Sequence, residues 1–307
     1  LKNNRLKMKK LLLILLCLPV IGFGQKTYVP DNMFEYCLEG MGMGDGVPLN
    51  DSVFTSAVDT LSLLDISFNL GTPIGNLIGI EDFTNLQRLE IKFQNIDSVD
   101  LSNNYFLNYI HLRDNHLMYV NVKDLSNLST LILDENQISH IDLTTNPQIN
   151  YFACQYNNIN SLDLSNQTYL QGLHCWDNNI SSLDLSNNIW LTYLNAENNS
   201  LTELDIRNGN NLQFTEFKVQ GNDDLYCIDV DNVIWSNNNW NFLPNNNISP
   251  WTYFSENCNS TSIQEQTINK ELFKVTDLLG RESKPQTNSP LIEIYNDGST
   301  EKKIIIE

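Results

Sequence analysis

Hydrophobic side chains recur at an interval of 21 residues through the middle of this chain of 307 residues. The first position of the unit is held in turn by Leu86, Leu107, Leu128, Ile149, Leu170, Leu191 and Leu212. Apolar residues also fill positions four, six, eleven, fourteen and sixteen, as Leu89, Ile91, Ile96, Val99 and Leu101 do in the first unit. A repeat of this length predicts stacked coils, in which neighbouring units together bury a core that no unit buries alone.

Asparagine holds position nine in most units, with Gln94 as the one departure. The series is Asn115, Asn136, Asn157, Asn178 and Asn199. A side-chain amide inside a bend can bond backbone groups that would otherwise be buried unpaired. The tandem motif Leu-x-x-Leu-x-Leu-x-x-Asn closely resembles the leucine-rich repeat. That resemblance implies a right-handed, curved, β-rich solenoid. The second half of each unit is too short and polar for a helix, so we expect extended chain on the convex side.

The repeat array is expected to span residues 61–232, about eight units, between two caps. Near its end the 21-residue phase slips by two residues and is restored at Phe214. Residues 25–60 are the expected N-terminal cap, with a short helix over 28–43. Residues 233–262 are the expected C-terminal cap. In the N-terminal cap, Asp31 is the expected N-cap residue of the helix. In the C-terminal cap, three bulky side chains should cover the last repeat: Trp235, Trp240 and Trp251.

Residues 1–24 are typical of an export signal, in which lysines precede an apolar run and small residues precede the cleavage point. The run of about ten apolar residues is too short to span a bilayer, which takes ~20 residues per helix. Met8 heads a better signal than the first residue does, so we expect Met8 to be the start. A lipid anchor on Cys17 is disfavoured because Leu16 stands where such motifs have Gly or Ala.

Residues 263–307 differ in character from the repeats. Three strand-like segments, 272–279, 291–295 and 302–306, are separated by turn residues, which predicts a small all-β module on a polar tether. The run Lys-Val-Thr-Asp-Leu-Leu-Gly-Arg at 274–281 and the Lys-Ile-Ile-Ile-Glu ending resemble the C-terminal sorting domain of the Bacteroidetes type nine secretion system. The resemblance implies outer-membrane export and removal of the tail, followed by anchoring or release. The alternative is an independent β appendage without a sorting role.

Charge and motifs narrow the function. Asp and Glu number 37 against 18 Lys and Arg, a net charge of −19, which would repel nucleic acid. The chain has no Gly-x-Ser-x-Gly and no His-Glu-x-x-His motif. His111 and His174 share a column three coils apart, ~14 Å, too far to share a metal, and His116 and His140 fall on bends. We therefore expect no enzyme, no cofactor and no metal centre.

The exposed positions three, five and seven should line a concave face, where aromatic residues gather. The candidate binding residues there, with a neighbour at position eight, are Tyr109, His111, Tyr151, Tyr156, His174, Trp176 and Tyr193. Aromatic rings give contact area at low entropic cost and keep a polar group, which suits a protein or a glycan ligand. The alternative is that these rings only shield the sheet.

Aspartate recurs at position fifteen, where its carboxylates should form an outward column ~5 Å apart. The column is Asp100, Asp142, Asp163, Asp184 and Asp205, interrupted by Asn121. Calcium would relieve the repulsion between the carboxylates. We favour the alternative, in which each Asp accepts hydrogen bonds from nearby backbone N–H groups or following Ser and Asn residues.

The cysteines suggest one disulfide. Cys227 and Cys258 bracket the C-terminal cap, and a bond between them would hold the open end of the solenoid. Cys154 and Cys175 occupy the inward position six of consecutive units and are expected to be small buried hydrophobes, with a disulfide between coils as the alternative. Cys37 has no obvious partner.

Together, the signal, repeats and tail resemble the secreted leucine-rich-repeat surface proteins of flavobacteria, with internalin-like repeats. The resemblance implies a secreted or outer-membrane cell-surface protein that binds a protein or glycan and meets the secretion machinery through its C-terminal domain. The alternative is a structural surface-layer or self-associating protein without a specific ligand, suggested by the acidic, Asn-rich convex side. We expect neither a nucleic-acid partner nor a transmembrane span.

Overall fold

The computed structural model describes residues 24–67, 71–240, 248–258, 272–276, 281, 290–295 and 300–304. The chain divides into two compact units, 1–258 and 259–307, which are described separately. Apart from Gly24, the expected export signal lies outside the described residues. Within the described parts of the chain, no helix is both long enough and apolar enough to cross a bilayer.

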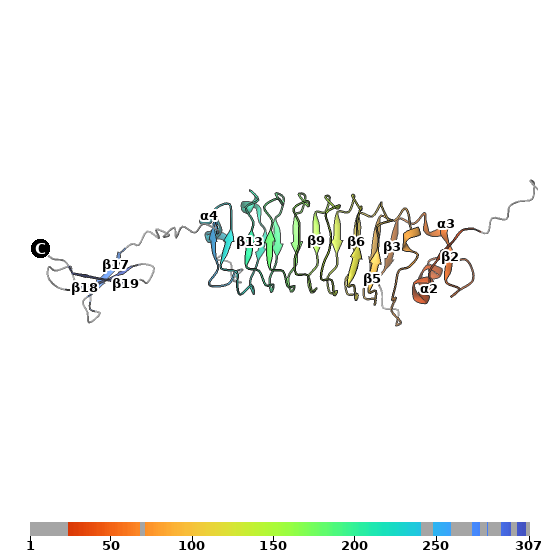
Figure 1. Ribbon diagram of the computed structural model, residues 1–307, viewed down its shortest axis with the longest axis horizontal. Coiled ribbons are helices and arrows are strands. Elements are labelled where there is room, and N and C mark those ends of the chain that lie inside the picture. The colour runs from red at the N-terminus through yellow and green to blue at the C-terminus, as the bar shows by residue number, and fades with distance from the viewer. Residues whose placement is uncertain are drawn as a thin grey trace, which may run out of the picture. The chain divides into compact units, whose positions relative to one another are not determined.

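The first unit is a solenoid built on an eight-stranded parallel sheet, to which each coil adds one strand (Figure 1). The strands, in spatial order, are β3 (Leu63–Ile66), β4 (Arg88–Ile91), β6 (Tyr109–His111), β8 (Thr130–Ile132), β9 (Tyr151–Ala153), β10 (Gly172–His174), β12 (Tyr193–Asn195) and β14 (Glu216–Lys218). From β4 to β12, each residue pairs with the residue 21 positions later, as Tyr151 does with Gly172. The sheet therefore confirms the β-rich repeat solenoid.

The convex side carries short parallel strands instead of helices. These are β5 (Ser98–Asp100) with β7 (Tyr119–Asn121), and β11 (Ser182–Asp184), β13 (Glu203–Asp205), β15 (Cys227–Asp229) and β16 (Tyr253–Ser255). Outside the caps, the described helical segments are two single 3₁₀ turns, η1 (Ile80–Asp82) and η2 (Asn211–Gln213). The expectation of extended chain in the second half of the unit is confirmed.

One continuous core runs through the stack, because the repeated apolar positions point inward in every regular coil. Leu131, Leu133 and Ile138, for example, are fully buried. Leu212 is the exception: it keeps the 21-residue interval but is 61% exposed. Tyr193 pairs with Glu216, 23 residues later, so the expected two-residue slip has already moved Leu212 out of phase. Leu212 therefore does not belong to the core column.

The asparagines of position nine tie neighbouring coils together. The Asn136 amide nitrogen donates to the carbonyl oxygens of Leu112, one coil back, and Leu133, both at 3.0 Å. Its carbonyl oxygen accepts the N–H of Leu117 at 2.9 Å. The same pattern repeats at Asn115, Asn157, Asn178, Asn199 and Asn222. These bonds pair backbone groups in the bend, as expected.

A second amide column, at position nineteen, does the same on the other bend. The Asn146 amide donates to the carbonyl oxygens of Val122 at 2.8 Å and Leu125 at 3.1 Å. The column also includes Asn104, Gln167 and Asn188. This column was not predicted from the sequence, although the recurrence of Asn and Gln at one position was its visible signal.

Position eight adopts the left-handed backbone conformation in every regular coil. The residues there, with φ between 50° and 61°, are Phe93, Asp114, Glu135, Tyr156, Asp177 and Asn198. This conformation is unusual for bulky residues such as Tyr156. It persists because the surrounding coils fix the bend: the Tyr156 N–H donates to the carbonyl oxygen of Trp176 at 3.1 Å.

The N-terminal cap is anchored by carboxylates that accept backbone N–H groups. Asp31 caps helix α2 (Asn32–Gly40) by accepting the N–H groups of Met33 and Phe34, and its other oxygen accepts the N–H of Gly75 at 2.8 Å. The helix is shorter than the expected 28–43, because strand β1 (Lys26–Tyr28) pairs with β2 (Ser52–Phe54) and the chain turns after Gly40. The short helix α3 (Thr55–Val58) follows β2.

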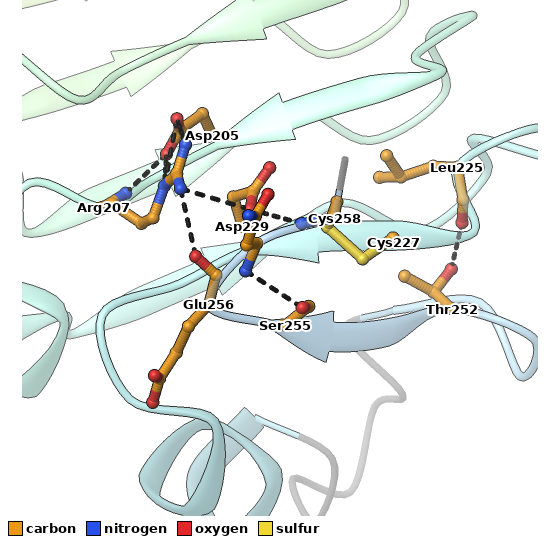
Figure 2. The surroundings of a disulfide bond; sticks show 10 residues. Asp205, Arg207, Leu225, Cys227, Asp229, Thr252, Ser255, Glu256 and Cys258 are labelled. Atoms are coloured by element: carbon orange, nitrogen blue, oxygen red, sulfur yellow. Dashed lines mark hydrogen bonds and ion pairs between the residues drawn. A yellow bond between two sulfur atoms is a disulfide. The ribbon is translucent and has the colours of Figure 1, made fainter. Parts of the chain in front are cut away.

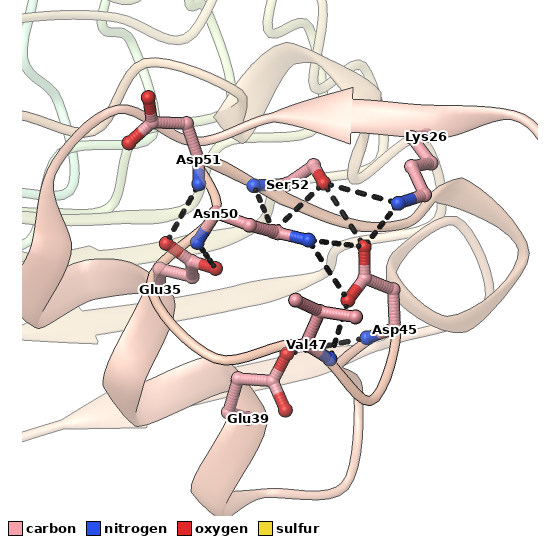
Figure 3. A network of polar contacts seen from close by, with 8 residues as sticks. All are labelled: Lys26, Glu35, Glu39, Asp45, Val47, Asn50, Asp51 and Ser52. Atoms are coloured by element: carbon pink, nitrogen blue, oxygen red, sulfur yellow. Dashed lines mark hydrogen bonds and ion pairs between the residues drawn. The ribbon is translucent and has the colours of Figure 1, made fainter.

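A loop in the same cap is held by two further acids. Glu35 accepts the N–H groups of Asn50 and Asp51, at 2.9 and 3.0 Å. Asp45 pairs with Lys26 and accepts from Asn50 and the Ser52 hydroxyl, contacts that hold its pKa well below the usual value (Figure 3). These bonds fold the loop onto α2.

The C-terminal cap closes the other end of the core. Trp240, at the end of α4 (Val233–Trp240), stacks on Phe217 at 4.2 Å between ring centroids and lies 5.5 Å from Phe254. A disulfide joins Cys227 to Cys258, and the Cys258 N–H donates to Asp229 at 2.8 Å (Figure 2). The cap strand β16 thereby becomes the last rung of the convex side.

The second unit contains a three-stranded antiparallel sheet of β17 (Leu272–Thr276), β18 (Pro290–Tyr295) and β19 (Thr300–Ile304). These strands overlap the three strand-like segments expected from the sequence. Residues 277–280 of the Lys-Val-Thr-Asp-Leu-Leu-Gly-Arg run lie outside the described residues.

Candidate ligand-binding surface

The outward positions of β9, β10, β12 and β14 form one aromatic and polar surface on the concave sheet. Parallel pairing places Tyr151, Gly172, Tyr193 and Glu216 side by side at position three. His174 occupies position five of the middle strand. Three of the seven expected binding residues therefore lie on adjacent strands, and we call Tyr151, His174 and Tyr193 the concave row.

The three rings of the concave row contact one another. His174 lies 5.4 Å from Tyr151 and is stacked on Tyr193 at 4.3 Å, between ring centroids. Gly172 makes room for this arrangement, because a Cβ atom there would lie 3.0 Å from Tyr151 Cδ2. The glycine therefore leaves no hole in the surface: the Tyr151 ring covers it.

The electrostatics of the concave row favour neutral rings. Burial lowers the pKa of His174, so the imidazole is uncharged at neutral pH. Burial and a hydrogen bond from the Tyr193 hydroxyl to Glu216 raise the pKa of Tyr193. Lys218 lies 2.5 Å from Glu216 and balances its charge. The row is an apolar strip with a fixed ion pair at its C-terminal end.

Tyr156 and Trp176 form a second aromatic group at the edge of the face, with ring centroids 4.4 Å apart in an edge-to-face contact. Tyr156 is 47% exposed. Beside Trp176, a cavity of about 520 Å³ opens between the edge of the last coils and the C-terminal cap. Its far wall is Trp251, which the sequence analysis assigned only to covering the last repeat.

Tyr109 and His111 lie apart from these groups, among charged residues. The Arg88 guanidinium lies 3.6 Å from the centre of the Tyr109 ring. His111 is 3.8 Å from Glu90, but burial and the nearby Lys92 lower its pKa to about 4. Thr130 and Ile132 on β8 separate this charged end from the concave row.

Asp134 lies between the two ends and was not predicted as a functional residue from the sequence. It is 5% exposed, and its Oδ1 has no hydrogen-bond partner within the described chain. Burial raises its pKa to about 6, although Arg113 acts in the opposite direction. The signal in the sequence was an acid at the outward position seven, flanked by aromatic residues in later coils.

The aspartate column of position fifteen bonds to its own backbone. Asp142 accepts the N–H of Thr144 at 3.0 Å and its hydroxyl at 2.7 Å. The same bond to the N–H two residues later is made by Asp100, Asp163, Asp184 and Asp205. These bonds confirm the favoured interpretation of the column. Among the residues that the structure describes, no three His, Cys, Asp or Glu side chains are grouped to hold a metal.

In the described part of the chain, the cysteines outside the disulfide carry free thiols. Cys154 and Cys175 are fully buried in consecutive coils, and burial raises the pKa of Cys175 to about 12. Both therefore act as small core residues, and the alternative of a disulfide between coils is wrong in this structure. Cys37 is also free and buried, on α2.

Comparison with known proteins finds similar solved structures, while no family model and no curated protein matches. A functional domain of InlJ from Listeria monocytogenes that includes a cysteine ladder is 21% identical, covers 67% of this chain and 68% of its own, with a TM-score of 0.38. Internalin C2 of L. monocytogenes is 22% identical over 67% and 99%, with a TM-score of 0.42. A leucine-rich-repeat protein of Leptospira interrogans is 17% identical over 66% and 62%, also at 0.42. The assignment to the leucine-rich-repeat fold stands on the strand register and the asparagine column.

Proposed function

We propose that this chain is a non-enzymatic recognition protein that binds a protein or a glycan through the concave row and the neighbouring pair Tyr156 and Trp176. The observation that carries the proposal is the contact between Tyr151, His174 and Tyr193 on three adjacent strands. A solenoid gains nothing in core burial from aromatic rings on its outward positions, because positions four and six already form the core. Rings held there by their neighbours are instead pre-organised for contact with a ligand.

The test is a binding screen of the secreted chain against glycan and protein arrays. The double variant Tyr151→Ala/Tyr193→Ala removes two rings of the concave row. Its matched control is Tyr105→Ala/Trp190→Ala, which removes two exposed aromatic residues from a bend outside that face. Binding that is lost in the first variant and kept in the control supports the proposal, whereas equal binding by both contradicts it.

The proposal includes export to the cell surface or the medium. It is supported by the resemblance of residues 1–24 to an export signal and of 263–307 to a type nine secretion sorting domain, which would engage the secretion machinery. The test is expression in a Bacteroidetes host of the full chain and of a chain lacking 263–307. Surface or medium localisation of the first and periplasmic retention of the second are expected. Identical localisation of both would remove the sorting role.

Self-association is a second candidate, favoured by exposed apolar side chains on one bend. Tyr169, Ile189, Trp190 and Leu212 come from neighbouring coils and are each more than half exposed. Sedimentation of the full chain over a range of concentrations, with and without calcium, tests it. A monomer throughout would exclude the structural, self-associating function.

A further inference from the structure

The cavity beside Trp176 is built from three successive coils and the C-terminal cap. Trp176 follows β10, Glu197 and Asn198 follow β12, and Gln220 follows β14. The cap contributes Trp251, just before β16. The cavity therefore exists only where the regular coils meet the cap.

The cavity is elongated along the solenoid axis. Three steps separate the coil of Trp176 from the cap segment of Trp251, which places their backbones ~14 Å apart at ~4.8 Å per step. Trp251 is 47% exposed. An occupant that reaches from one tryptophan to the other must be a chain of linked units, about three sugar rings or four extended peptide residues long.

The polar side chains between the two tryptophans are available to a ligand. Glu197, Asn198, Gln220 and Asp223 line the cavity, and their side chains form no hydrogen bond or ion pair with other residues in the described ranges. Gly221 keeps this floor open, because a Cβ atom there would lie 2.3 Å from the Asn198 amide oxygen. Its φ of 76° also suits glycine.

The charges exclude an acidic occupant. Two carboxylates line the cavity and no Lys or Arg does, in a protein with a net charge of −19. Phosphorylated, sulfated and uronic-acid ligands would be repelled. A neutral or a basic chain remains.

The two amides decide between these. Carboxylates only accept hydrogen bonds, but the NH₂ groups of Asn198 and Gln220 are donors, which a cationic side chain cannot satisfy; in a basic peptide only the backbone carbonyl oxygens accept from them. Sugar hydroxyls both donate and accept, and the C–H faces of pyranose rings pack on tryptophan. We propose that the cavity between Trp176 and Trp251 binds a neutral oligosaccharide of about three units. This site is separate from the concave row, although Trp176 adjoins both.

The experiment measures calorimetric binding of the full chain to neutral hexasaccharides: β-1,4-glucan, β-1,3-glucan, mannan and N-acetylchitohexaose. Hexalysine is the cationic probe. At least one saccharide should bind, with affinity unaffected by 0.5 M salt, at which the Debye length is only about 4 Å. Trp251→Ala should weaken that binding by about tenfold, and Gln220→Ala by about threefold.

The matched controls separate this site from the concave row. Tyr119→Ala removes a comparably exposed aromatic side chain from the convex strand β7, and Asp224→Asn alters the neighbour of the lining Asp223. Both should leave binding unchanged. Saccharide binding lost in Tyr151→Ala but kept in Trp251→Ala would overturn the cavity site while supporting the concave row. Absence of saccharide binding at millimolar concentration, or salt-sensitive binding of hexalysine alone, would also overturn it.

Discussion

The two ends of the concave sheet share one backbone but differ in what their side chains do. At the N-terminal end, Arg88, Glu90 and Lys92 pair with one another around Tyr109 and His111. At the C-terminal end, Tyr151, His174 and Tyr193 contact one another without a charge between them. The strands pair in parallel at both ends, so the backbone sets the same spacing of outward positions. The residue types at those positions therefore determine whether the surface is charged or aromatic.

This difference bears on binding because charged and aromatic groups respond differently to a partner. At the charged end, Glu90 is buried and its carboxylate is already paired with both Arg88 and Lys92, so it has little left to offer a ligand. In the concave row, the Tyr193 hydroxyl at the C-terminal end donates a hydrogen bond to Glu216. The C-terminal end is therefore better suited to bind a ligand. Substitutions confined to one end or the other test this.

The largest effect is expected from breaking the stack between the two ends, with Asn157→Ala. The Asn157 amide bonds the carbonyl oxygens of Leu133 at 2.9 Å and Cys154 at 3.0 Å, and its oxygen accepts the Ile138 N–H at 2.9 Å. Leaving these buried backbone groups unpaired should lower the free energy of unfolding by about 3–5 kcal/mol.

Urea denaturation followed by circular dichroism measures this loss. Because each coil contacts only its neighbours, the transition should also broaden as the two ends begin to unfold separately. The adjacent Asn158→Ala is the control: that side chain is exposed, so stability should change by less than about 0.5 kcal/mol. Equal effects of the two variants would show that the asparagine column does not couple the coils.

The second effect concerns Asp134, which lies between the ends. Its pKa is about 6 in the folded protein against 3.8 for the free side chain, so the folded state holds the proton more tightly. Stability from this group is therefore full below pH 4 and is lost as the pH rises to about 6. Asp134→Asn removes the carboxyl group whose ionisation destabilises the folded state. The variant should therefore be more stable than the parent by ~1–3 kcal/mol at pH 7.5, with little change at pH 3.5.

Thermal unfolding at the two pH values checks the sign. Asp142→Asn is the matched control, because hydrogen bonds from Thr144 lower the pKa of Asp142. Its substitution should destabilise the protein at neutral pH and have less effect in acid. A stabilising Asp142→Asn, or an Asp134→Asn variant without pH dependence, would contradict these assignments.

Much of this arrangement follows from the sequence, for identifiable reasons. A position buried in every coil must be apolar in every coil, so the 21-residue period reveals the core and, by difference, the concave positions of Tyr151, His174 and Tyr193. The disulfide between Cys227 and Cys258 and the Asp31 cap were also foreseeable, from their places at the ends of the array.

The rest depends on interactions that leave no periodic trace. Position eight is left-handed whether it holds Tyr156 or Asp177, because neighbouring coils impose the bend, so residue type does not reveal it. The place of Trp251 depends on how the non-repeating cap folds back beside Gln220. The phase slip before Phe214 was visible, but its effect on Leu212 needed the observed pairing.

A smaller effect is expected from uncovering the concave row with Tyr151→Ala. Loss of the ring contact with His174 should cost about 1 kcal/mol of stability. Because burial lowers the pKa of His174, exposing the imidazole should raise that pKa toward 6.5. Protonation of His174 in mild acid would then destabilise the variant less than the parent. NMR titration of the imidazole measures the shift, and Tyr105→Ala should leave it unchanged.

The smallest effect is expected at the charged end, from Arg88→Met. The variant keeps an apolar side chain of similar length but loses the guanidinium group. That group lies over the Tyr109 ring, and its Nε donates to the Glu90 carboxylate at 2.6 Å. Lys92 remains 3.0 Å from Glu90, so stability should fall by only about 0.5 kcal/mol. The pKa of Glu90 is below its usual value, because the lowering by Lys92 and Arg88 exceeds the raising by burial. Loss of Arg88 should therefore raise the pKa of Glu90. Titration of Glu90 by NMR measures this change, with Lys123→Met as the control.

Unaltered ligand binding by Arg88→Met would sharpen the contrast between the ends, and binding lost in this variant would place the ligand on the charged end instead.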